Sequence, residues 1–100
     1  MIKHISMARF KDSAEGCSKE ENIEKVKAKL LALKEKVPNI HSVEFGIDIL
    51  HRENDFDVIS YSDYESMDDV KATVTHPAHD EFVALLSKVT IVSYSVTYTV

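Results

Sequence analysis

Apolar and polar residues alternate along four stretches of this chain, as they do in β-strands whose side chains point to opposite faces. The last stretch is the clearest, because serines and threonines alternate with apolar and aromatic residues that share one face, namely Val92, Tyr94, Val96, Tyr98 and Val100. In the second stretch, Gly46 predicts either a bulge or a place where something approaches the backbone closely. We therefore predict four strands, at residues 2–11, 40–51, 56–64 and 90–100.

Two segments between these strands have apolar residues at helical spacing. The first segment follows Ser18, which forms a capping box with Glu21 three residues later, and it ends before Pro38. Its apolar stripe consists of Ile23, Val26, Leu30, Leu33 and Val37. The second segment is broken by Pro77, because proline disfavours a helical conformation in the residue before it and suits the first position of a new helix. We expect one short piece at residues 66–75 and a second piece that ends near residue 89.

The predicted order of elements is β-α-β-β-α-β, in which the second helix is the broken one. This is the ferredoxin-like α+β arrangement, an antiparallel four-stranded sheet with helices packed on one face. Several strands carry apolar residues on both faces, and a single copy would therefore expose a large apolar patch. Two sheets packed face to face would bury that patch, so we predict a homodimer through the open sheet face, in which the two copies form a dimeric α/β barrel.

Composition places the chain in the class of ordinary globular domains. Its length of 100 residues suits one domain, residues 1–100. The formal net charge of -5 argues against nucleic acid or an anionic membrane as a partner. No apolar run approaches the ~18 residues of a membrane span, and no signal peptide is recognisable. Cys17 is the single cysteine, which fits a reducing compartment. We expect a cytoplasmic protein.

The stretch His76-Pro77-Ala78-His79 carries the candidate chemistry. His79 lies in the first turn of the second helical piece, on the same face as Phe82, where the positive end of the helix dipole favours the neutral imidazole. A neutral, partly buried imidazole can act as a general base. A core histidine hydrogen-bonded to the backbone would produce the same pattern.

A metal site at His76-Pro77-Ala78-His79 is an alternative to the general base. The two histidines and the acidic residues that follow them would supply two or three ligands. However, histidines before and after a proline point in different directions, and a metal demands exact geometry. We expect neither a metal nor an organic cofactor.

The chain resembles the stress-responsive A/B barrel domain family, also called dimeric α+β barrel (Dabb) proteins, over nearly all of its length. The resemblance rests on Ile2-Lys3-His4-Ile5 with Phe10-Lys11, Pro38, Phe45-Gly46, Tyr64-Glu65-Ser66, His76-Pro77-Ala78-His79 with Phe82, and Tyr94. It implies a ferredoxin-like protomer whose sheet joins that of a partner to make a barrel. Most members of this family have no known activity.

One branch of the family, the plant polyketide cyclases, implies an enzyme that closes a linear polyketide by aldol condensation without metal or cofactor. This resemblance makes His79 the general base and places His4 in the same pocket. The tyrosine that assists the base in that branch falls on Thr73, which is shorter and far less acidic. Pocket positions of the first helix fall on Val26, Lys27 and Leu30, and Lys27 does not suit a site for an apolar polyketide.

Two hypotheses follow. In the first, the protein is a homodimeric stress-responsive A/B barrel protein of unestablished activity that binds a small apolar or aromatic ligand between sheet and helices. Its pocket lies near His4 and His79 and is lined by Val26, Leu30, Thr73, His76 and Phe82. In the second, it is a cofactor-independent lyase or cyclase with His79 as base and His4 orienting the substrate. An enclosed apolar cavity of roughly a few hundred Å³ that reaches His79 would support ligand binding, whereas side chains filling that space would exclude the enzyme.

Overall fold

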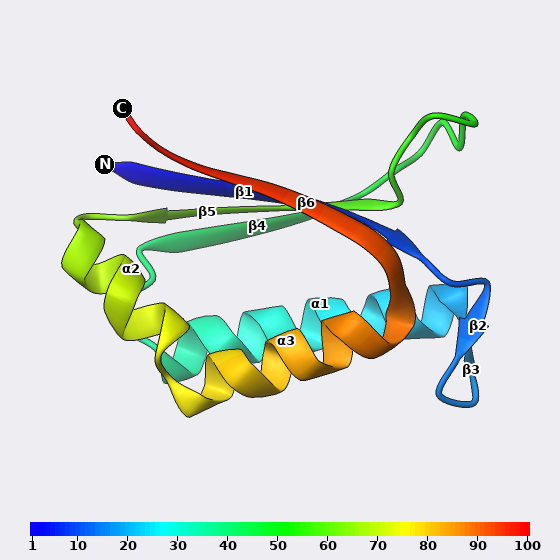
Figure 1. Cartoon of the computed structure of the whole chain (residues 1–100), viewed down its shortest axis with the longest axis horizontal. Helices are drawn as coiled ribbons and strands as arrows, with labels where there is room; N and C mark the ends of the chain where they lie inside the picture. Colours follow the sequence, from blue (N-terminus) through cyan, green and yellow to red (C-terminus); the bar gives the residue numbers. More distant parts are fainter.

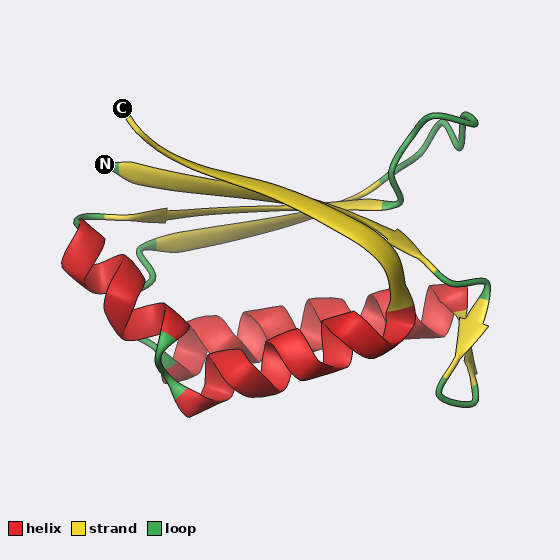
Figure 2. Cartoon of the chain, viewed as in Figure 1, coloured by secondary structure: helices red, strands yellow, loops and turns green.

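The protein is built in two layers, a four-stranded sheet and three helices packed on one of its faces (Figures 1 and 2). The computed structural model describes all residues from Met1 to Val100. The elements in chain order are β1 (Ile2–Phe10), β2 (Ser13–Ala14), β3 (Cys17–Ser18), α1 (Lys19–Lys36), β4 (Ser42–Ile47), β5 (Val58–Tyr64), α2 (Met67–Val74), α3 (Pro77–Val89) and β6 (Thr90–Thr99). The predicted ferredoxin-like α+β fold is confirmed.

The sheet has the strand order β4-β5-β1-β6, and all neighbouring strands are antiparallel. The first and last strands of the chain therefore lie side by side, and β4 and β6 form the two edges. Figure 1 shows that α1, which connects β1 to β4, and the pair α2–α3, which connects β5 to β6, cross the same face. The chain ends meet at one end of the sheet, where the N–H of Val100 donates to the carbonyl of Met1 at 3.0 Å.

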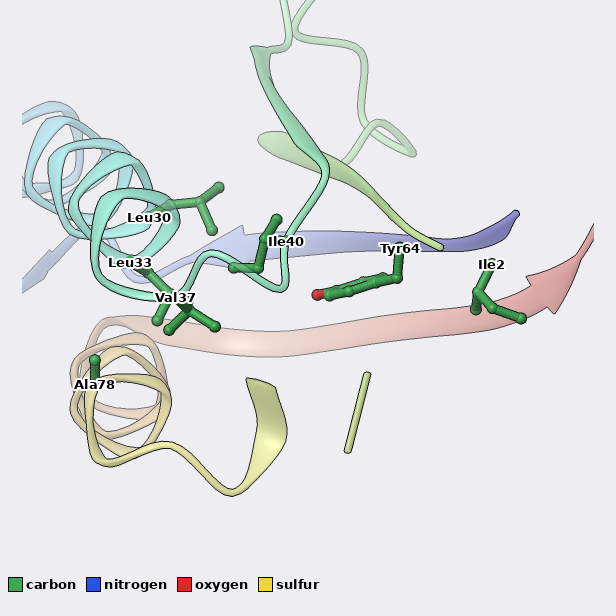
Figure 3. Close-up of a cluster of buried hydrophobic side chains, with 7 residues drawn as sticks. All are labelled: Ile2, Leu30, Leu33, Val37, Ile40, Tyr64 and Ala78. Atoms are coloured by element: carbon green, nitrogen blue, oxygen red, sulfur yellow. The ribbon is translucent and has the colours of Figure 1, made fainter. Parts of the chain in front are cut away.

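The face of the sheet beneath the helices, here called the inner face, carries most of the buried core. Ile2, Ala8 and Phe10 point inward from β1, and Val58 and Tyr64 are their counterparts on β5. Two clusters of buried side chains form there. Figure 3 shows the cluster at the α2 end of the sheet, which consists of Ile2, Leu30, Leu33, Val37, Ile40, Tyr64 and Ala78.

The opposite face, here called the open face, is covered by no helix (Figure 2). The register between β1 and β6 places Ile5 beside Val96 and Met7 beside Tyr94 on this face. Tyr94 is 64% exposed and Val96 53% exposed, which is high for residues in a regular sheet. As predicted, both faces of the sheet carry apolar groups.

Local signals set the helix ends. The N–H of Glu21 donates to Ser18 Oγ at 3.2 Å and the N–H of Ser18 donates to Glu21 Oε1 at 3.0 Å, which is the predicted capping box. Pro77 occupies the first turn of α3. His76 is the N-cap of that helix, and its Nδ1 accepts a hydrogen bond from the N–H of Ala78 at 3.0 Å. The break between α2 and α3 is thus where the sequence predicts it.

The second strand is shorter than the predicted residues 40–51. The N–H of His51 donates to Asp48 Oδ2 at 2.8 Å and His51 has a φ of 54°, so the chain turns out of the sheet after Ile47. This turn leaves Ile49 and Leu50 exposed to 85% and 62%. In Figure 1 the segment between β4 and β5 rises from the sheet on the side away from the helices.

The structure decides between the two alternatives predicted for Gly46. Gly46 makes no bulge, because it pairs in regular register with Ile59, and the one shift in the main sheet lies between Arg9 and Phe10. The expected close approach is present, since a Cβ on Gly46 would lie 3.0 Å from Ile59 Cγ2. The connection between β1 and α1 contains the hairpin β2–β3, whose two-residue strands are too short to show alternation in the sequence.

Candidate functional site

A cavity of about 150 Å³ lies between the inner face of the sheet and the helices α1 and α3. Val26 and Leu30 of α1 contribute apolar walls, and Phe82 of α3 contributes another. His4 of β1 and His79 of α3 also line it. The structure therefore brings together five of the residues that the sequence singled out, from three separate elements.

His4 is held in place by the neighbouring edge strand. The register between β1 and β6 sets it directly beside Thr97, and its Nδ1 lies 2.8 Å from Thr97 Oγ1. This contact restrains the imidazole and occupies one ring nitrogen. The other ring nitrogen makes no hydrogen bond within the protein and remains available to a bound molecule.

His79 lies in the first turn of α3 and is partly buried. The rings of His4, His41 and His76 are each hydrogen-bonded within the protein, whereas the His79 ring makes no such bond. The alternative of a core histidine satisfied by the backbone therefore does not describe this residue. Its imidazole faces the cavity with both nitrogens free of protein partners.

Burial favours the neutral form of both imidazoles. Burial lowers the pKa of His79, and the nearby carboxylate of Asp80 opposes this only in part. Burial also lowers the pKa of His4, and repulsion from His79 lowers it further. Because a neutral imidazole has one nitrogen that can accept a proton, either ring can act as a base near neutral pH.

Thr73, His76 and Lys27 lie elsewhere. The Thr73 side chain is buried, and its hydroxyl donates to the carbonyl of Asp69 at 2.9 Å, within its own helix. His76 caps α3 with its ring turned back to the helix backbone. None of the three is among the residues that line the cavity, so the predicted pocket lining does not include them. Lys27 therefore places no charge in the wall of the cavity, and the objection to an apolar ligand that rested on Lys27 does not apply.

Four polar residues of the cavity were not anticipated. Ser6, Ser60 and Ser95 line it from three adjacent strands, and Tyr64 brings its phenol to the same space. In Figure 3 the Tyr64 ring lies between Ile2 and Ile40, with its hydroxyl turned away from Ile2. The signal for Ser6 was present in the sequence, because a residue two positions after His4 on a strand points to the same face.

The cavity has no set of ligands for a metal ion. No group of three or more His, Cys, Asp or Glu side chains comes together in the structure. The polar groups that line the cavity are imidazoles, aliphatic hydroxyls and one phenol. These groups bind by hydrogen bonds and transfer protons.

Comparison with known proteins shows the family. Residues 2–99 match the family described as Stress responsive A/B Barrel Domain, or Dabb. The chain belongs to this family. No curated protein matches the Dabb chain. None of its helices combines the length and the apolar run that crossing a membrane requires.

Solved structures share the fold along almost the whole Dabb chain. A dimeric ferredoxin-like protein of unknown function from Bacteroides fragilis is 25% identical, with a TM-score of 0.84 over 99% of this chain and 95% of that one. A hydroxynitrile lyase from Passiflora edulis is 19% identical, with a TM-score of 0.84 over 99% and 92%. SnoaB, a cofactor-independent oxygenase from Streptomyces nogalater, is 13% identical, with a TM-score of 0.74 over 99% and 91%.

Proposed function

We propose that this Dabb protein is a homodimer that binds a small molecule in the cavity beside His4 and His79. The observation that carries the proposal is the His79 imidazole, which is partly buried and faces the cavity without a hydrogen-bond partner in the protein. A partly buried imidazole without a protein partner can offer its ring nitrogens to a bound molecule.

The size of the cavity limits the ligand. Cavities of about 150 Å³ in protein cores hold a molecule such as benzene. The present cavity has the same volume, and Val26, Leu30 and Phe82 give it an apolar wall. A single ring or a short branched chain fits this space, whereas a linear polyketide is several times larger. Binding of a ring-sized molecule is therefore the reading that the geometry supports best.

The open face supports the homodimer. Exposed apolar patches of this kind mark interfaces in soluble proteins, and the structurally similar protein from Bacteroides fragilis is described as dimeric. The segment after β4, with the exposed side chains of Ile49 and Leu50, rises on the same side and extends the apolar surface toward a second copy. Light scattering at micromolar concentration should give twice the mass of the chain, and a monomer would contradict the proposal.

A thermal-shift screen of small aromatic and branched alcohols, ketones and acids tests the pocket. Compounds that bind should raise the melting temperature of the wild type and of His51→Ala, because the His51 ring lies outside the cavity and is 76% exposed. They should raise that of His79→Ala much less. Equal responses from the wild type and His79→Ala would remove His79 from any site.

A cofactor-independent lyase or cyclase is the second candidate. It is favoured by the neutral and unpartnered His79 imidazole beside His4, and by the Tyr64 phenol, which lines the cavity and offers the acidic hydroxyl that Thr73 lacks. Enzymes described as a lyase and as a cofactor-independent oxygenase also have this fold, although at their low identity they show the fold alone.

The base chemistry has a direct test. A general base at His79 should catalyse the exchange of the methyl protons of acetophenone in D₂O, a reaction that proton NMR follows without knowledge of the natural substrate. Exchange should fall at least tenfold in His79→Gln and stay unchanged in His51→Gln. No exchange above the buffer rate with the wild-type protein would reject the enzyme and leave the binding function untouched.

A further inference from the structure

Three serines form a straight row across the floor of the cavity. Ser6 of β1 pairs with Ser60 of β5 on one side and with Ser95 of β6 on the other. All three line the cavity. Residues directly opposite each other on neighbouring strands have Cβ atoms about 5 Å apart, so the row places three hydroxyls along roughly 10 Å of the inner face.

The hydroxyls of this row make no hydrogen bond within the protein. The serine side chains that do make one all lie outside the cavity, at Ser18, Ser42, Ser66 and Ser87. Ser6 and Ser60 are partly buried and Ser95 is exposed, so the row leads from the β6 side of the molecule inward. Because no protein group occupies these hydroxyls, they can donate hydrogen bonds to a bound molecule and accept hydrogen bonds from it.

The absence of charged side chains around the cavity limits the class of ligand that it can bind. No Lys, Arg, Asp or Glu lines the cavity, and burial favours the neutral form of its two imidazoles. A carboxylate or an ammonium group entering this space would lose its water without gaining an opposite charge. A carbonyl or hydroxyl group suits the row, because each serine both donates and accepts hydrogen bonds.

We propose that the row Ser60–Ser6–Ser95 is the polar subsite of the cavity, and that it selects an uncharged, ring-sized molecule bearing a hydroxyl or carbonyl group. This inference rests on the binding function proposed above and adds the chemical class of the ligand. The apolar part of the ligand lies against Leu30 and Phe82, and its oxygen lies on the sheet beside Ser6.

Three probe molecules of similar size separate the contributions of the ring, the hydroxyl group and a charge to the binding affinity. Benzyl alcohol has the ring and the hydroxyl, toluene has the ring alone, and benzoate has the ring with a charge. Binding to the wild-type protein is measured by titration in ¹⁵N–¹H NMR spectra at pH 7.5. We expect benzyl alcohol to bind about tenfold more tightly than either toluene or benzoate.

The matched variants are Ser6→Ala and Ser93→Ala. Ser93 lies on the same face of β6, two residues from Ser95, and does not line the cavity. One hydrogen bond contributes a factor of roughly three to ten in affinity. Ser6→Ala should therefore weaken the binding of benzyl alcohol by that factor and leave the binding of toluene unchanged. Ser93→Ala should bind all three probes as the wild type does.

The outcomes separate this inference from the function on which it rests. If toluene and benzyl alcohol bind equally in the wild type, or if Ser6→Ala weakens both equally, the cavity binds ligands but the serine row does not select them. If benzoate binds best, the neutral class is wrong. If none of the probes shifts the signals of cavity residues, both the subsite and the proposed binding function are overturned.

Discussion

Beneath the helices, the three adjacent strands β5, β1 and β6 meet in the row Ser60–Ser6–Ser95, whereas one residue earlier or later on the opposite face they present Tyr61, Ile5 and Val96. The covered face thus carries small hydroxyls at its centre, and the uncovered face carries large apolar side chains. Hydrophobic burial within one chain would produce the opposite distribution. The difference agrees with the two proposals made above, a second copy packed against the open face and a ligand bound at the hydroxyls of the inner face.

The largest expected effect comes from a charge on the open face. Val96→Glu would place a carboxylate on the central apolar patch of each copy, and leaving such a charge buried and unpaired costs about 3–5 kcal/mol. The mass measured by light scattering should fall from dimer to monomer. Leu31→Glu is the control, because Leu31 is a similarly exposed apolar residue at 46% but lies on α1, on the helical side. A dimer that survives Val96→Glu would place the interface elsewhere.

Filling the inner face should separate stability from binding. Ser6→Val removes an unpartnered hydroxyl, adds apolar volume to the cavity and favours a strand conformation, so the free energy of unfolding should rise by about 0.5–1 kcal/mol. Ligand binding should be lost at the same time. Urea denaturation and the benzyl alcohol titration measure the two effects. Ser93→Val, outside the cavity, should leave binding intact, and a Ser6→Val protein that still binds would show that the ligand does not use the floor.

Acid should weaken the fold through the inner face first. The pKa values of His4 and His79 are lowered in the folded protein from an ordinary value of 6.5, so the unfolded chain binds more protons. The free energy of unfolding is therefore highest above pH 6.5 and falls as the pH is lowered through that value. On the open face, Asp63 has a pKa lowered from 3.8, chiefly by its hydrogen bond from Ser42, so its contribution is lost only at more acidic pH.

Urea denaturation at pH 7.5 and pH 5.5 checks this expectation. The free energy of unfolding should differ between these two pH values in the wild type. This difference should shrink in a His4→Gln, His79→Gln double variant and persist in His51→Gln, whose ring is exposed. An unchanged difference in the double variant would show that the two cavity histidines do not set the acid sensitivity.

The smallest expected effect lies at Gly46. An added methyl group would lie 3.0 Å from Ile59 Cγ2, so Ile59 must shift by a few tenths of an ångström. Ile59 is 38% exposed in a single copy and has room to do so, hence the free energy of unfolding of Gly46→Ala should stay within about 0.5 kcal/mol of the wild type. In a packed dimer the same shift is restricted. Sedimentation should therefore show weaker dimerisation, and unchanged dimerisation would place Ile59 outside the interface.

The fold was predictable because its signals are local. Ser18 with Glu21 starts α1, Pro77 starts α3, and the alternation of apolar residues marks four strands. The errors have local physical causes as well. Asp48 accepts a hydrogen bond from the backbone of His51 and ends β4 early, although Ile49 and Leu50 continue the apolar pattern.

The candidate site was predictable only in part. His4, His79, Val26, Leu30 and Phe82 line the cavity, where the family resemblance and helical spacing place them. The spacing from His4 could have indicated Ser6, but the row itself could not be predicted, because no local signal shows that Ser60 and Ser95 pair with Ser6. Strand order decides this, and strand order arises from contacts between residues far apart in the chain.

The edge strand β6 links the assembly of this protein to its solubility. Its ten residues contain no charge and no proline, and only one of its sides is paired, with β1. Long, uncharged edge strands of β-branched and aromatic residues are templates on which further chains add and aggregate. In the proposed dimer, a second copy packed over Tyr94 and Val96 covers the apolar face of this strand, so we expect the separated protomer to be the species most prone to aggregation. Dilution, rather than heating alone, is then a condition under which the protein should be lost from solution.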